Sequence, residues 1–297
     1  MSIRILAIVV LMTVSFHALA QDPCLVLDVP EKPIISAAVS YVGEADVTAD
    51  YPDLPKPGMT EFDAQWEFAY FRDIWGGDVD LDAVINARVF SDRSFLRMPD
   101  QLINIYLDAG WARRYENNLG CQIRLRPGLY SDFEQFTGKA LAVPARLMGV
   151  YTISPDMSVV LGADVRFGFE RVVMPVAGLT WAPSDTVRID ARVPEARLGW
   201  YFDADWIFEA GWLWRSDSYQ IRESNQLDRE MFTMEEQRAY LGLTHWMSDF
   251  LSLSLQAGLV FDRTMEFKKQ DTVFNLPRKS EIDDAFFVSL TIGGPFL

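Results

Sequence analysis

Residues 251–267 read LSLSLQAGLVFDRTMEF, and nearly every second side chain in this run is apolar. The residues between them are polar or small, and only Val260 and Arg263 depart from the alternation. Because successive side chains of a strand point to opposite faces, the run predicts one strand with an apolar face and a polar face. Most strands of soluble proteins are only about 5–6 residues long. A strand of this length therefore separates two different solvents along its whole course.

The same alternation recurs along most of the chain, which predicts about fourteen strands. We place them at 35–48, 60–73, 78–91, 102–114, 120–132, 142–153, 157–168, 173–182, 186–193, 196–203, 206–221, 233–247, 250–267 and 284–293. A secreted chain that repeats this pattern is best explained by an all-β fold, a transmembrane antiparallel up-and-down β-barrel. Its outer face meets lipid and its inner face meets water or polar side chains.

The connections between these strands divide by length. The short ones are rich in Gly, Asn, Asp and Pro, which suit tight reversals, and lie at 75–78, 117–120, 154–156, 182–185, 202–205 and 247–249. The long ones lie at 49–59, 92–101, 133–141, 216–232 and 268–283. An even number of strands places every short turn in the periplasm, together with both termini, and every long loop outside.

The short connection Val193-Pro194-Glu195 decides the strand number. If it is no turn, 186–203 is a single strand and the barrel has twelve strands. The turns at 203–205 and 247–249 would then fall on the outer side. We therefore prefer the split into two strands, and so fourteen, with twelve as the alternative.

The N-terminus has the features of a secretory signal. Arg4 precedes a short apolar run at 5–14, and Ala18-Leu19-Ala20 fits the small-x-small cleavage rule. We therefore expect a signal peptide at 1–20, a periplasmic segment at 21–33 and an outer-membrane barrel at 34–297. The expected surroundings are outer-membrane lipid and the barrel assembly machinery. A net charge of −15 argues against nucleic acid as a partner.

The sequence offers little for catalysis. The mature chain keeps one histidine, His245, beside a predicted periplasmic turn, whereas a histidine-based acyl hydrolase needs a complete constellation. No His/Cys cluster has metal-ligand spacing, so we expect neither a metal, nor a cofactor, nor an enzyme. Cys24 and Cys121 both fall on the periplasmic side and could form a disulfide. The shared phase of Cys121 with the lipid-facing Ile123 argues against that bond.

The charged side chains on the polar phase are the candidate functional residues. We expect these residues to line the lumen and to set selectivity: Arg124, Arg126, Arg188, Arg192, Arg197, Asp108, Asp164, Asp190, Glu209 and Asp262. About fourteen strands make a barrel wider than the eight-stranded kind, whose own side chains fill it. We therefore expect a porin-like channel for small solutes with a charged lumen. The alternative is a structural or interaction barrel with a blocked lumen, in which the charges form ladders that satisfy one another.

Four stretches of sequence carry a family resemblance: 112–114 with 126–133, then 172–185, then 193–198, and finally 261–267 with 283–287. On these stretches the chain, from about residue 104 onward, resembles a bacterial family of outer-membrane β-barrels that is catalogued as a domain of unknown function. The resemblance implies a barrel in the outer membrane and no particular chemistry. The chain departs from the common barrel ending, because Phe296 is penultimate and Leu297 is last.

Overall fold

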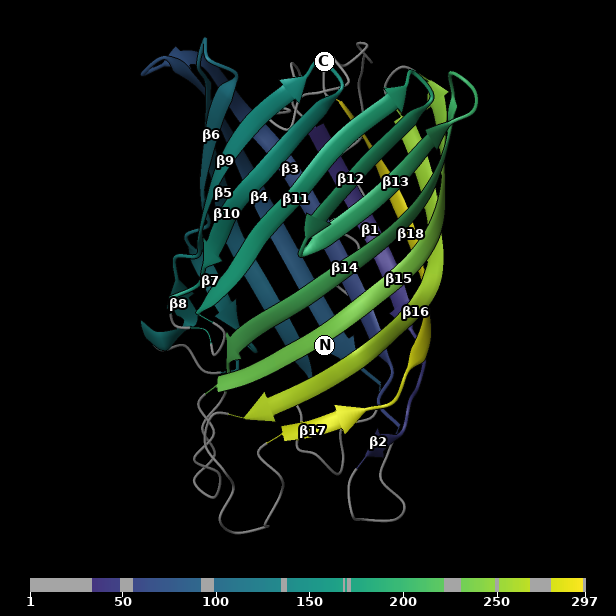
Figure 1. Cartoon of the computed structure of the whole chain (residues 1–297). Helices are drawn as coiled ribbons and strands as arrows, with labels where there is room; N and C mark the ends of the chain where they lie inside the picture. Colours follow the sequence, from purple (N-terminus) through teal and green to yellow (C-terminus); the bar gives the residue numbers. More distant parts are fainter. Residues whose placement is uncertain are drawn as a thin grey trace.

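The computed structural model describes residues 34–48, 56–91, 99–134, 138–167, 169, 172–221, 231–248, 251–267 and 279–295. The expected signal peptide, the segment 21–33 and the last two residues lie outside these ranges. The described residues form one closed antiparallel barrel (Figure 1). No helix among them is long and apolar enough to cross a membrane.

The wall contains eighteen strand segments, and four short ones continue a longer neighbour, which leaves fourteen strands around the barrel. The segments are β1 (Ile34–Val42), β2 (Val47–Thr48), β3 (Met59–Ile74), β4 (Gly77–Phe90), β5 (Gln101–Arg114), β6 (Leu119–Leu125), β7 (Gly128–Ser131), β8 (Leu141–Ala142), β9 (Ala145–Ser154), β10 (Met157–Val165), β11 (Val173–Ser184), β12 (Val187–Val193), β13 (Glu195–Tyr201), β14 (Trp206–Gln220), β15 (Met231–Ser248), β16 (Leu251–Phe267), β17 (Lys279–Ile282) and β18 (Ala285–Pro295). The 3-10 turn η1 (Gly138–Ala140) precedes β8.

The barrel closes where its first strand meets its last. β1 pairs antiparallel with β18, in a register that runs from Ile34 opposite Pro295 to Val42 opposite Phe287. The outer surface carries the apolar residues of the alternation, such as Leu107, Leu161 and Leu255, the last with 53% of its surface exposed. The predicted fold class, an all-β antiparallel barrel of about fourteen strands, is confirmed.

The short turns gather at one end of the barrel, the upper end in Figure 1, which we call the short-turn end. Trp75, Gly76 and Asn118 adopt the left-handed backbone that tight reversals need. The connection at Pro194 is a hairpin between β12 and β13, so fourteen strands, and not twelve, are present. The opposite end, where β4 ends and β5 begins, is the long-loop end.

The alternation that opens the sequence analysis changes phase within β16. Asp262 and Arg263 together face the single residue Glu236 of β15, which is a β-bulge. Before the bulge Val260 points inward, and after it Met265 and Phe267 join Val260 in the same buried cluster. Asp262, which we expected to line the lumen, is exposed, and Arg263 takes the buried position.

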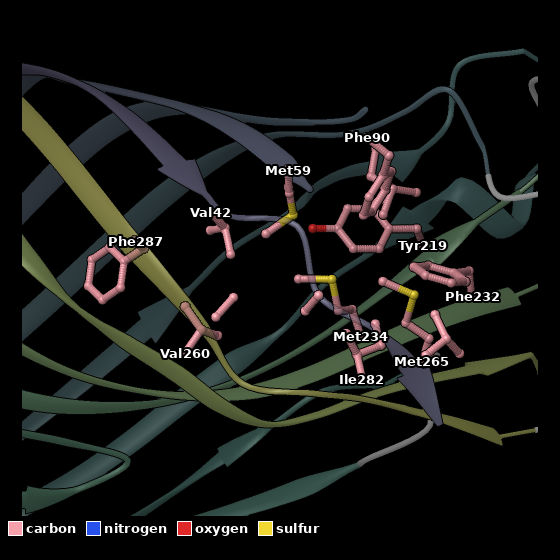
Figure 2. Packing of buried hydrophobic residues seen from close by; sticks show 14 of the residues in the cluster. Val42, Met59, Phe90, Tyr219, Phe232, Met234, Val260, Met265, Ile282 and Phe287 are labelled. Carbon is pink, nitrogen blue, oxygen red and sulfur yellow. The ribbon is translucent and has the colours of Figure 1, made fainter. Parts of the chain in front are cut away.

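Apolar side chains pack against one another inside the long-loop end (Figure 2). They come from both sides of the barrel: Val42, Met59, Phe90 and Leu102 from β1, β3, β4 and β5, and Tyr219, Phe232, Met265 and Phe287 from β14, β15, β16 and β18. Each of these side chains is at most 5% exposed. The interior of this end is therefore a packed core.

The end of β14 reaches a strand that is not its neighbour in the wall. Gln220 pairs in parallel with Ser131 of β7, and the amide of Asp132 donates a hydrogen bond to the carbonyl of Gln220 at 3.1 Å. Along most of its length β14 pairs instead with β13 and β15. This contact narrows the barrel toward the long-loop end.

Candidate functional site: the charged lumen

Ion pairs cross the lumen next to the packed core, on the side of the short-turn end. On β4, Arg88 places Nη2 2.8 Å from an Asp217 carboxylate oxygen on β14 and Nε 3.1 Å from Glu61 on β3. β4 pairs only with β3 and β5, so the bond from Arg88 to Asp217 spans the interior rather than neighbouring strands. A second cross-lumen pair joins Arg215 to Glu61 at 3.2 Å. These contacts, which we call the cross-lumen pairs, tie β3 and β4 to β14.

Glu61 is the centre of this layer. Three guanidinium groups contact its carboxylate, because Arg238 of β15 adds a 2.6 Å bond to those of Arg88 and Arg215. Arg238 also donates from Nε to Glu236 at 2.8 Å. Nη1 of Arg88, a residue that is only 4% exposed, has no hydrogen-bond partner among the described residues. The layer therefore carries one buried donor that it does not satisfy.

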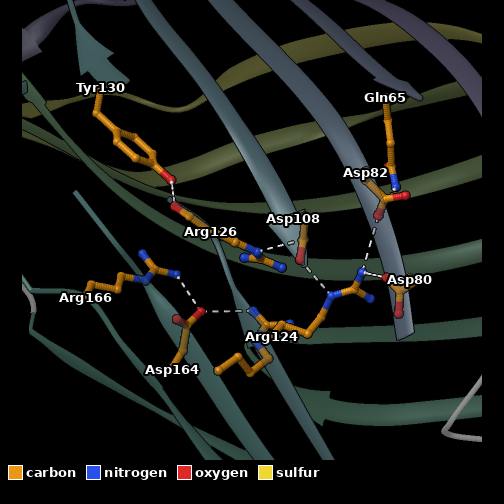
Figure 3. A network of polar contacts seen from close by, with 10 residues as sticks. Gln65, Asp80, Asp82, Asp108, Arg124, Arg126, Tyr130, Asp164 and Arg166 are labelled. Atoms are coloured by element: carbon orange, nitrogen blue, oxygen red, sulfur yellow. Dashed lines mark hydrogen bonds and ion pairs between the residues drawn. The ribbon is translucent and has the colours of Figure 1, made fainter. Parts of the chain in front are cut away.

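A second network lies nearer the short-turn end (Figure 3). Arg124 of β6 contacts Asp80, Asp82 at 3.3 Å and Asp108 at 2.8 Å. Arg126 donates from Nε to the other oxygen of Asp108 at 2.9 Å. Residues of β4, β5 and β6 thus meet on adjacent strands, which is how opposite charges pair across a sheet.

Two further arginines share one carboxylate on the neighbouring wall. Arg146 of β9 and Arg166 lie 3.0 Å and 3.2 Å from the same oxygen of Asp164 on β10. Arg166 also donates from Nη1 to the carbonyl of Ser216 on β14. Nε of Arg146 is buried and has no hydrogen-bond partner among the described residues. The guanidinium groups here outnumber the carboxylates that they contact.

The β12–β13 hairpin carries its own pairs. Arg192 contacts Asp190 within β12. Arg197 lies 2.9 Å from Glu195 and 3.7 Å from Glu209 of β14. The side chains of Arg197 and Glu195 are 49% and 47% exposed, although the pattern of the hairpin points them inward. The lumen is therefore hollow beside this part of the wall.

A cavity of about 230 Å³ lies between these networks, and each network contributes at least one arginine to its lining. Six arginines line it, namely Arg88, Arg126, Arg146, Arg166, Arg192 and Arg215, against only two acids, Glu195 and Asp217. Its other lining residues include the apolar side chains of Val176, Pro194 and Leu213. The cavity combines many hydrogen-bond donors with an apolar margin.

The structure brings several of the candidate lumen residues together. Arg124, Arg126 and Asp108 form one network, and Asp164, Asp190 and Glu209 each contact an arginine. Arg188 occupies the same face of β12 as Arg192. Asp262 is apart from them, beyond the β-bulge, where it accepts a 2.7 Å hydrogen bond from Gln237. The arginines that we expected to line the lumen are thus largely interleaved with carboxylates.

Sequence reasoning named neither Glu61, nor Asp217, nor Glu236 as site residues. All three are polar residues within predicted strands, so alternation marks them as candidates, but it does not say which residue lies across the barrel. Cys24 lies outside the described residues, and the sulfur of Cys121 is 3.5 Å from the Tyr115 hydroxyl, so the disulfide stays a prediction. His245 stacks on Trp206, with the ring centroids 4.1 Å apart. The described residues contain no cluster of metal-ligating side chains.

Fold and site together define a closed β-barrel with an apolar exterior and a charged interior. The chain belongs to the family described as domain of unknown function DUF6268, whose model matches residues 89–293. This confirms the resemblance found from the sequence. No curated protein matches the chain.

Several solved structures have a similar fold. The COG4313 outer membrane channel from Pseudomonas putida F1 is 11% identical, with 91% of this chain and 97% of that one covered and a TM-score of 0.47. The CymD monoaromatic hydrocarbon channel is 10% identical over 90% and 89% of the two chains, with a TM-score of 0.44. The KdgM porin is 7% identical over 89% and 99%, with a TM-score of 0.41.

Proposed function

We propose that this protein is an outer-membrane barrel that passes small solutes, and that its axial path is shut in the conformation described. The apolar exterior and the expected signal peptide support the location. The charged, partly hollow lumen supports the passage of polar solutes. Under this proposal the partners are outer-membrane lipid, the assembly machinery and the solutes, and the protein has no catalytic role.

The cross-lumen pairs are the observation that carries the proposal. A solute that moved along the axis would have to separate Arg88 from Asp217 and then pass the packed core around Tyr219. Packed interiors leave few voids larger than a water molecule, so such a layer excludes solutes. The protein is therefore a gated passage rather than a permanently open pore.

The packed core also favours a second candidate function. Two of its members at the long-loop end, Phe90 and Phe232, are at most 2% exposed, as in the interior of a soluble domain. A barrel that is closed permanently in this way would serve as a structural or interaction protein. The two functions differ in whether weakening the cross-lumen pairs opens a path.

Swelling of liposomes that contain the purified barrel separates these functions. The test variant is Arg88→Ser with Asp217→Ser, which removes both charges together and so leaves neither one unpaired opposite the other. We expect swelling in a small sugar to be several-fold faster than with the wild type.

The matched control is Lys56→Ser with Asp46→Ser. This pair is joined at 2.9 Å, and both side chains are more than half exposed, away from the packed lumen. The hydrogen bond from Lys56 to Asp46 raises the pKa of Lys56. The control should swell like the wild type. If liposomes with the folded test variant swell no faster than those with the wild type, the channel proposal is wrong. The protein is then a structural or interaction barrel with a blocked lumen.

A further inference from the structure

The barrel wall contains fewer strands at its long-loop end than at its short-turn end. β5 pairs with β6 toward the short-turn end and with β7 toward the long-loop end. β6 pairs onward with β9, but β7 reaches β14 directly, at Ser131 opposite Gln220. At that level the wall bypasses β9 to β13, so nine of the fourteen strands form a ring: β1, β3, β4, β5, β7, β14, β15, β16 and β18, the first and last continued there by β2 and β17. We call this ring the outer ring and the junction of β7 with β14 the clasp.

The size of the outer ring explains why its interior is filled (Figure 2). Side chains just fill the interior of an eight-stranded barrel. The outer ring is little wider than that, and its inward residues Phe90, Tyr219 and Phe232 are at most 2% exposed. Because so dense an interior leaves few voids larger than a water molecule, rearranged side chains alone provide no path for a solute. The ring itself has to widen before a solute can pass.

The clasp is the shortest junction of the outer ring among the described residues. β7 and β14 share a single pair of ladder positions, and one more bond joins the amide of Asp132 to the carbonyl of Gln220 at 3.1 Å. Other junctions of the ring are long ladders, such as that of β4 with β5 from Asp78 to Val89. Separating β7 from β14 therefore breaks fewer backbone hydrogen bonds than separating any other two neighbours in the outer ring.

Two buried side-chain oxygens beside the clasp have no hydrogen-bond partner among the described residues. They are Oε1 of Gln220 and Oδ1 of Asn104, and both residues are 4% exposed. Asn104 lies on β5 and donates from Nδ2 to the Tyr219 hydroxyl of β14 at 3.4 Å, so it bridges the two sides of the clasp. A buried acceptor without a partner costs free energy, whereas water that enters a separated clasp can donate to both oxygens. Separation at this junction therefore recovers part of the free energy that breaking its bonds costs.

β14 is anchored on the short-turn side of the clasp. The amide of Trp214 donates a hydrogen bond to the carbonyl of Pro194 at 2.8 Å, and Arg166 donates from Nη1 to the carbonyl of Ser216. Neither bond involves β7, so both can persist when the clasp separates. Only residues 217–220, together with residues 231–234 of β15 that pair with them, have to move away from β7.

We propose that the clasp is the gate of the barrel, and that the outer ring opens when the end of β14 separates from β7. The cavity of the charged lumen already reaches this junction, because Asn104 and Tyr130 line it on one side and Asp217 on the other. Separation extends the cavity to the long-loop end. The bond between Arg88 and Asp217 restrains the same part of β14, so its loss favours opening. The proposal rests on the proposed function and assigns its gated passage to one junction of the wall.

A disulfide across the clasp tests the gate by liposome swelling. Ser131→Cys with Gln220→Cys joins two ladder partners. This pair is introduced into the variant in which Arg88 and Asp217 are serine and both native cysteines are also replaced by serine. We expect liposomes with the oxidised barrel to swell several-fold more slowly than liposomes with the same barrel after reduction. Equal swelling before and after reduction, with the disulfide formed, would show that the barrel opens elsewhere and would overturn the proposal.

The matched control shares one cysteine with the test variant. Gln220→Cys with Met231→Cys joins β14 to β15, which are ladder partners at this position and move together in the proposed opening. Liposomes with this control should swell equally fast before and after reduction. If oxidation slows the control as much as the test variant, the effect is not specific to the clasp, and the assignment of the gate is wrong.

Hydrogen exchange of single amides gives a readout that does not need conduction. The amide of Asp132 bonds across the clasp, whereas the amide of Leu107 bonds at 3.0 Å to the carbonyl of Pro127, beside the junction of β5 with β7. Replacing Arg88 and Asp217 by serine should speed exchange at Asp132 several-fold and leave Leu107 unchanged. Unchanged exchange at Asp132 in a variant that swells faster would overturn the clasp while the channel stands. Faster exchange at Asp132 in a variant that does not swell would support the clasp and overturn the channel alone.

Discussion

At the scale of single residues, Glu61 is the carboxylate on which three arginines of the lumen converge. It is 1% exposed and neutralises part of the charge on Arg88, Arg215 and Arg238. Removing one member of a buried ion pair leaves an uncompensated charge, which costs about 3–5 kcal/mol. We therefore expect Glu61→Gln to lower the free energy of unfolding by about that much, as measured by urea titration of the refolded barrel. Glu195→Gln, at a half-exposed carboxylate, should change it by less than about 1 kcal/mol, and similar losses in both would contradict this role of Glu61.

Selectivity also belongs to the residue scale. The carboxylates that contact Arg124, Arg192 and Arg197 weaken the anion preference that unpaired arginines would give. We expect a modest preference for anions in reversal potentials, measured in the opened Arg88 and Asp217 variant. Adding Arg124→Ser and Arg188→Ser to it should move the potential toward cations, and adding Lys56→Ser should not. A potential that does not move would show that these arginines do not line the path.

Alternation in the sequence identified Arg124, Arg126, Asp108 and Asp164 as inward charges, and the structure pairs each of them. It could not identify Asp217 as the partner of Arg88. Alternation tells which face a side chain takes, but a bond across the lumen depends on how the closed wall bends. Asp262 does not face inward as the alternation predicts. The reason is the bulge that Asp262 forms with Arg263, which shifts the phase of every later residue of β16.

At the scale of elements, the alternation in β16 predicts the strand, and the exceptions to the alternation indicate an irregularity within it. The two exceptions in the alternation of 251–267 lie at the bulge, because Arg263 forms it together with Asp262 and Val260 comes two residues before Asp262. Apart from Val260, the apolar residues before the bulge face outward, whereas Met265 and Phe267 after it face the packed core. The sequence alone predicts an irregularity here. It does not predict that the later apolar residues turn inward, because that depends on the strands across the barrel that complete the packed core.

The first half of β16 gives a direct test of its phase. Leu255 is 53% exposed on the outer face, whereas Ser254 accepts a 2.9 Å hydrogen bond from Thr244 on the inner face. An arginine on the lipid face near the membrane centre costs about 2–4 kcal/mol. We expect Leu255→Arg to reduce the folded fraction in heat-modifiable gel migration more than Ser254→Arg does. The reverse order, or equal loss, would show that the phase is wrong.

The β12–β13 hairpin was predictable in part. Turn parity and Pro194 placed the reversal correctly, because an uninterrupted strand would have put the later short turns on the other side. The early end of this hairpin was not predictable: β12 and β13 have seven residues each, against twelve in β11 and fifteen in β14. Local periodicity carries no information on where neighbouring strands end.

At the scale of the whole molecule, the strand number alone suggests a wide lumen. Side chains packed inside the barrel make the lumen narrower than that number suggests. The contact of β14 with β7 and the apolar core bring opposite walls together at the long-loop end. The hollow part remains beside the β12–β13 hairpin, where Arg197 and Glu195 are half exposed. The packed core and the cross-lumen pairs thus close the barrel along its axis at the long-loop end, and the hollow part lies nearer the short-turn end.

Single-channel recording in planar bilayers tests the axially closed barrel most directly. The wild type should stay closed for most of the record, with rare brief openings, because an opening requires the Arg88 and Asp217 bond and the core around Tyr219 to separate. Replacing both Arg88 and Asp217 by serine should lengthen the openings, while the exposed Lys56 and Asp46 control should not. A steady, large open conductance in the wild type would contradict the closure that the cross-lumen pairs describe.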